Sequence, residues 1–150
     1  MTLRNLVISA TKLMTKSRDS LNTVRLLMRI IAAVFFVGAG INHFVKPEFY
    51  RQIIPPIFPA RALLVLLSGI CEIAGGVGIL IRPLRRAAGW GLIALLCAVF
   101  PANVYMATSP QLTPGRDFPH WMLWARLPLQ LVIIAWIWFV AIASSPSRED

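Results

Sequence analysis

The chain has few charged residues: only 14% of its 150 residues are Asp, Glu, Lys or Arg, whereas 57% are hydrophobic. This scarcity excludes a soluble globular protein, because a domain folded in water needs more charge than this on its surface. The mean hydropathy of +0.70 points the same way. The composition therefore predicts a polytopic membrane protein.

Cysteine and histidine are also scarce. The two cysteines, Cys71 and Cys97, do not form a CxxC motif, and the two histidines are His43 and His120. Structural zinc sites and axial haem ligation need a fuller set of ligands, so we expect neither a metal site nor an encoded cofactor. Free buried thiols are expected in preference to a disulfide between the two cysteines.

Four apolar stretches are long enough to cross a bilayer, which takes about 20 helical residues. They span residues 26–45, 61–81, 87–107 and 121–143. Because the connections are short, consecutive helices should pack antiparallel. The predicted fold is all-α: an antiparallel bundle of four transmembrane helices within a membrane domain at 26–143, followed by a short tail at 144–150.

The net charge of +9 is arranged as a topology signal. Basic residues precede the first span and fill the loop at Arg82, Arg85 and Arg86, whereas the other two loops carry fewer basic residues and some acids. Basic flanks stay in the cytoplasm, so both termini are expected there, in a bacterial inner membrane. Nucleic acid is not an expected partner, because these charges flank spans instead of gathering with base-stacking aromatics.

Residues 1–25 form a separate basic segment. Apolar residues recur in it at helical spacing, with basic and hydroxyl residues between them. This pattern predicts an amphipathic helix on the inner leaflet, in contact with anionic lipid. A mitochondrial transit peptide is the alternative, whereas a secretory signal peptide would need a longer apolar core and a cleavage site.

Polar side chains inside the spans should gather in one half of the bilayer, between the outer surface and the midplane. Counting about 1.5 Å of rise per residue places them in the outer half of the bilayer and leaves the inner half almost purely apolar. They form a candidate ligand-binding or buried polar network: His43, Glu72, Asn103, Tyr105, Arg126 and Gln130. The outer loop at 46–60, rich in proline and aromatics, should lie at the interface, either as a gate over these residues or as an anchor.

Glu72 and Arg126 should form an ion pair, since each costs about 2.5–3.5 kcal/mol to place in hydrocarbon. Such a pair, held by amide neighbours, has two interpretations. It can fix the register of the helices without binding anything, or it can face a functional cavity. Glycines around Glu72, including Gly69 and Gly75, favour either close helix contact or room for a ligand.

The order of several residues resembles the DoxX-like family of small membrane proteins. The match covers all four spans and is carried by His43, Pro47, Glu72, Pro101 with Asn103, and Arg126 with Pro128 and Gln130. The resemblance implies a four-helix bundle and, from some members, association with redox systems such as a thiosulfate:quinone oxidoreductase. Related thiol oxidoreductases use paired cysteines, which this chain lacks.

Three functions follow. The favoured one is an auxiliary, non-catalytic subunit that binds a hydrophobic small molecule such as quinone and needs a redox partner protein. In it Arg126, Asn103 and His43 donate to the ligand and Glu72 accepts a proton. The alternatives are an interaction or assembly factor with a structural Glu72–Arg126 pair, and a small transporter. The transporter is disfavoured because the apolar inner half offers no second acid.

Overall fold

A computed structural model of the chain describes residues 3–143, with side chains from residue 20 onward. The expected tail at 144–150 lies outside the described residues. The α-helices are α1 (Leu3–Val45), α2 (Pro47–Ile53), α3 (Arg61–Gly78), α4 (Arg85–Thr108) and α5 (His120–Ile137). Two short 3₁₀ helices, η1 (Pro110–Leu112) and η2 (Pro114–Asp117), join α4 to α5, and a π-helical segment, η3 (Trp138–Ile142), continues α5.

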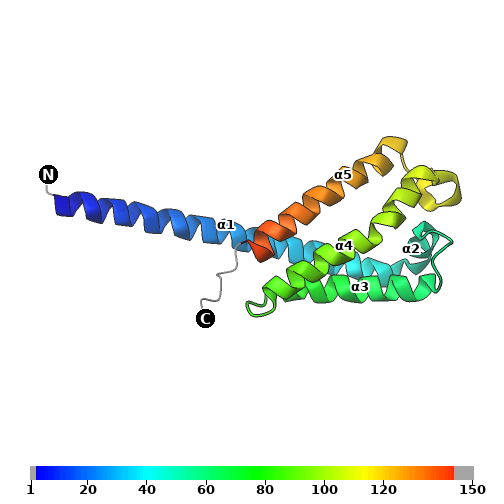
Figure 1. Cartoon of the computed structure of the whole chain (residues 1–150), viewed down its shortest axis with the longest axis horizontal. Coiled ribbons are helices and arrows are strands. Elements are labelled where there is room, and N and C mark those ends of the chain that lie inside the picture. The colour runs from blue at the N-terminus through cyan, green and yellow to red at the C-terminus, as the bar shows by residue number, and fades with distance from the viewer. Residues whose placement is uncertain (1–2, 144–150) are drawn as a thin grey trace.

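Four helical segments are long and apolar enough to cross a membrane: Ser20–Val45 of α1, α3, α4, and α5 with η3. They form an antiparallel bundle, with α2, η1 and η2 at one end and the α3–α4 loop at the other (Figure 1). Large apolar side chains such as Val34, Leu131 and Val132 are exposed on its outside, as expected for contact with lipid. The prediction of an all-α integral membrane bundle is confirmed.

The N-terminal segment continues directly into the first span. α1 is one uninterrupted helix from Leu3 to Val45, and its N-terminal part extends beyond the bundle (Figure 1). The expected boundary after residue 25 therefore does not appear as a break in the helix. The location of this segment on the inner leaflet stays a prediction.

Two apolar clusters hold the bundle together. One, towards the α3–α4 loop, contains Phe36, Ile79, Leu92 and Val140 among its buried residues. The other, at the α2 end, is built from Ile53, Met106, Ala107 and Leu123. Along the helices, the polar residues of the predicted network lie between these two clusters. Apolar packing on both sides therefore positions the polar layer.

The contact between α1 and α3 depends on two facing glycines. A Cβ added at Gly40 would lie 2.7 Å from the Gly69 carbonyl oxygen, and one added at Gly69 would lie 2.9 Å from the His43 Cβ. Neither position has room for a side chain, because these distances are shorter than van der Waals contact. Glycine near Glu72 therefore serves close helix approach, and the helix faces that carry His43 and Glu72 are brought together.

A basic residue at the start of the first span is buried in the bundle. Arg29 is buried, and its Nε donates to the Val140 carbonyl oxygen of η3 at 2.7 Å. The Arg25 guanidinium lies 5.5 Å from the centre of the Phe139 ring. Arg29 is one of the basic residues at the start of the first span, and it is held inside the bundle because its long guanidinium side chain reaches a backbone acceptor.

The close contact between the two glycines can be tested with a pair of variants. Gly40→Ala should lower the free energy of unfolding by about 1–3 kcal/mol, the usual cost of overpacking. Gly38→Ala is the matched control, because a Cβ added at Gly38 meets nothing within 4 Å, and its effect should stay within about 0.5 kcal/mol. Unfolding in mixed micelles of increasing dodecyl sulfate measures both variants, and equal losses would contradict the assignment.

Candidate functional site

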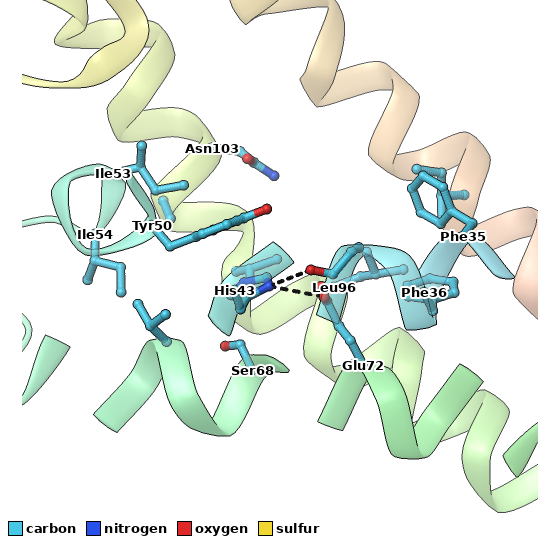
Figure 2. Close-up of a pocket in the computed structure, with 15 residues that line it drawn as sticks. Phe35, Phe36, His43, Tyr50, Ile53, Ile54, Ser68, Glu72, Leu96 and Asn103 are labelled. Carbon is cyan, nitrogen blue, oxygen red and sulfur yellow. Dashed lines mark hydrogen bonds and ion pairs between the residues drawn. The ribbon is translucent and has the colours of Figure 1, made fainter. Parts of the chain in front are cut away.

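A central cavity of about 200 Å³ lies in the polar layer. Side chains from all five α-helices line it, and Figure 2 shows them converging on His43 and Glu72. The polar lining residues are His43, Tyr50, Ser68, Glu72 and Asn103. The apolar wall includes Phe35, Phe36, Leu96, Val99 and Ile133.

His43 and Glu72 form the ionisable pair at the centre of this cavity. The His43 Nδ1 lies 3.3 Å from the Glu72 Oε2 and 3.0 Å from the Ala39 carbonyl oxygen (Figure 2). Because a carbonyl oxygen can only accept, the Nδ1 must carry a proton, which fixes the tautomer of a neutral His43 ring. The ring is thus held by its own helix, and the Glu72 carboxylate lies beside the same nitrogen without accepting a hydrogen bond from it.

Glu72 retains unused hydrogen-bonding capacity. Its Oε2 atom is buried, and within residues 20–143 it makes no hydrogen bond, since the His43 contact has the distance of an ion pair without hydrogen-bond geometry. A buried carboxylate oxygen without a donor is unfavourable, because it has lost water and gained little in return. The atom is therefore placed to accept a hydrogen bond, or a proton, from a molecule in the cavity.

The Tyr50 ring covers one face of the His43 ring. The two rings stack with centroids 3.8 Å apart and an angle of 21° between their planes. The Tyr50 hydroxyl accepts a hydrogen bond of 2.8 Å from the Asn42 Nδ2, and burial raises the pKa of this hydroxyl above its usual 10.0, so it stays protonated at neutral pH. The predicted outer loop at 46–60 thus contains a short helix, α2, that folds back over the cavity, and its buried Ile53 anchors it.

The predicted ion pair between Glu72 and Arg126 is wrong. The Arg126 Nη1 contacts the Met106 sulfur at 3.2 Å, and the guanidinium lies 5.4 Å from the centre of the Phe118 ring. Tyr50 lies between the two side chains, because it lines both the cavity that contains Glu72 and a second cavity that contains Arg126. Counting residues along the spans left a space in which the two side chains could meet. A short helix from the outer loop occupies that space.

Arg126 belongs to a second, end cavity of about 330 Å³. Its lining residues are Asn42, Lys46, Phe49, Tyr50, Ile53, Asn103, Phe118 and Arg126. Tyr50, Ile53 and Asn103 line both cavities, so they form the partition between them.

The amide residues of the predicted network hold α4 to α5. The Asn103 Nδ2 donates to the Gln130 Oε1 at 2.9 Å, and the Gln130 amide donates to the Leu96 carbonyl oxygen. Gln130 is 4% exposed and lies behind the cavity wall as a positioning residue for Asn103. Tyr105 lines neither cavity.

Four of the six predicted network residues, His43, Glu72, Asn103 and Arg126, therefore line a cavity, and they are divided between two. Tyr50 was absent from the predicted set, because an aromatic residue in a loop is usually an interfacial anchor. A usable signal was the charged and apolar pattern of 47–53, which permits one short amphipathic helix directly after His43.

Cys71 and Cys97 are free, and both are exposed on the outside of the bundle. The expectation of free thiols is confirmed, whereas their expected burial is wrong. Within residues 3–143, no group of three or more His, Cys, Asp or Glu side chains is placed to hold a metal ion.

Fold and site together define a small four-helix membrane protein with a buried His–Glu pair beneath a short covering helix. The family model "Domain of unknown function (DUF8561)" matches residues 32–141, and the chain belongs to this family. The matched range contains every residue that lines the two cavities. Neither a curated protein nor a solved structure matches the chain.

The covering role of Tyr50 can be measured at the two histidines. Diethylpyrocarbonate should modify exposed His120 readily and His43 slowly, because His43 is 8% exposed. A stacked aromatic pair contributes about 0.5–1.5 kcal/mol of interaction energy. Tyr50→Ala removes this contribution, so the rate of His43 modification should rise by up to about tenfold, whereas the rate at His120 should not change. Tyr105→Ala is the matched control, and mass spectrometry of peptides gives both rates. Equal His43 rates in both variants would refute the covering role.

Proposed function

We propose that this protein binds a hydrophobic small molecule with a polar head, a quinone being the chemical class we favour, in the central cavity. The observation that carries the proposal is the buried Glu72 Oε2, which lacks a donor among the described residues and lies beside His43 at a cavity with mainly apolar walls. A ligand hydroxyl or its proton would meet the unused capacity of this oxygen.

The walls suit such a ligand. Asn103 and Ser68 add polar groups beside Glu72 and His43, whereas Phe36, Leu96 and Val99 offer apolar contacts. Phe35 lines the cavity and is also 48% exposed on the outside of the bundle. A head group in the cavity could therefore keep its apolar tail in the surrounding lipid, passing Phe35.

Quinone chemistry moves protons together with electrons. When a quinol is oxidised, two electrons and two protons leave it. Glu72 would accept one proton and the Nε2 of the neutral His43 ring the other. The electrons require a partner, so we propose an auxiliary subunit that works with a redox partner protein, in line with the DoxX-like resemblance. The arginine-rich α3–α4 loop supports an orientation with both termini in the cytoplasm of a bacterial inner membrane.

Bound molecules provide the test. Wild-type protein purified in mild detergent should yield a quinone on extraction with organic solvent, identified by mass spectrometry. Ser68→Phe, which fills the cavity while keeping every charge, should reduce the yield at least about tenfold, because its ring occupies the ligand's space. Glu72→Gln should reduce it less, since Gln still donates and accepts but cannot take a proton.

Ile70→Phe is the matched control. It adds the same ring to the same helix at a position that is 48% exposed to the lipid side, so its yield should equal that of the wild type. Quinone recovered equally from wild type, Ser68→Phe and Ile70→Phe would place the molecule in the detergent–lipid belt and contradict the proposal.

A further inference from the structure

The end cavity differs in charge from the central one. Two cationic side chains, Lys46 and Arg126, line it, and none of its lining residues is acidic. Two other arginines at this end of the bundle have carboxylate partners: Arg51 pairs with Glu48 at 2.7 Å and Arg116 with Asp117 at 3.8 Å. Within residues 20–143, neither Lys46 nor Arg126 forms such a pair.

Arg126 is held in place by groups that do not neutralise it. Its Nη1 donates to a thioether sulfur, which is a weak acceptor, and its guanidinium lies over the Phe118 ring. Both contacts orient the planar guanidinium while leaving other N–H groups for a stronger acceptor. A cation positioned in this way at a cavity wall is typical of anion recognition.

The two amides of the cavity add hydrogen-bond donors. The Asn42 Nδ2 donates to the Tyr50 hydroxyl and the Asn103 Nδ2 donates to Gln130. Each of these amide nitrogens has a further N–H, and the protonated Tyr50 hydroxyl keeps a proton to donate after accepting from Asn42. The end cavity thus combines cations with neutral hydrogen-bond donors. A molecule bound there would supply the acceptor oxygens.

From this arrangement we infer that the end cavity is a binding site for an oxyanion, a carboxylate or phosphate group, held by Arg126 and Lys46. The site goes beyond the proposed function, because the ligand of the central cavity is neutral and is recognised at Glu72 on the other side of Tyr50. The group can reach the cavity as a free anion from the aqueous phase or as the phosphate of a lipid headgroup. Both sources present the same oxygens to Arg126.

Inorganic phosphate is the first probe. Protein in a phosphate-free sugar detergent is titrated with sodium phosphate, with sodium chloride keeping the ionic strength constant, and the unfolding midpoint is recorded. A second titration uses dihexanoyl phosphatidic acid below its micelle concentration, with dihexanoyl phosphatidylcholine as the lipid control. Stabilisation by phosphate identifies a free-anion site, whereas stabilisation by the phosphatidate alone identifies a headgroup site. No stabilisation beyond the chloride and phosphatidylcholine controls overturns the inference.

Variants locate the binding. Arg126→Gln should weaken the apparent affinity at least about tenfold, because a charge-assisted bidentate contact is lost. Lys46→Gln should weaken it several-fold, and Lys46 is exposed, so this variant keeps the inference testable even if Arg126→Gln fails to fold. Arg51→Gln removes an equal charge from the same end outside the cavity and should leave the affinity unchanged. An affinity unaltered by Lys46→Gln and by any folded Arg126→Gln overturns the assignment.

Discussion

The close approach of α1 and α3 at Gly40 and Gly69 is the constraint on which the rest of the site depends. Backbone of one helix lies against backbone of the other there, with no space for a side chain. His43 lies next to Gly69, because a Cβ added at Gly69 would lie 2.9 Å from the His43 Cβ. Glu72 is one turn further along antiparallel α3, and the close approach of the two backbones lets its side chain and the imidazole come within 3.3 Å. Apolar clusters on both sides fix the pair at its depth, and a buried carboxylate is thereby kept next to the ring that can share its proton.

The covering helix gives the polar layer two compartments. Tyr50 stacks on His43 and occupies the space between Glu72 and Arg126, so the acid of the layer lies on one side of the ring and the unpaired cations lie on the other. In a low-dielectric setting, opposite charges that do not neutralise each other are costly. This separation favours ligands over a purely structural role, because the end compartment contains cations without an acidic partner and the central one contains a carboxylate oxygen without a hydrogen-bond donor.

The separation also bears on the alternative functions. An assembly factor with a structural Glu72–Arg126 pair needs those charges in contact, and they are not in contact. Arg29 shows what a structural cation looks like in this bundle: it is buried, and its Nε donates directly to the Val140 carbonyl oxygen. Arg126 instead donates to sulfur and faces a cavity, which supports a binding role.

Composition and apolar length alone determined the class of protein, because helices that cross hydrocarbon must be long, apolar and internally hydrogen-bonded. The same counting predicted that His43, Glu72, Asn103 and Arg126 gather in one region, since helical rise is regular, and these residues line two adjoining cavities. Rise along a helix says nothing about the direction in which a side chain points, or about which segment enters the space between helices. Only the tertiary structure decided that Glu72 contacts His43, that Tyr50 separates Glu72 from Arg126, and that Arg29 is buried. The contact at Glu72 and the burial of Arg29 depend on how the helices pack. The position of Tyr50 depends on a loop that folds back into the bundle.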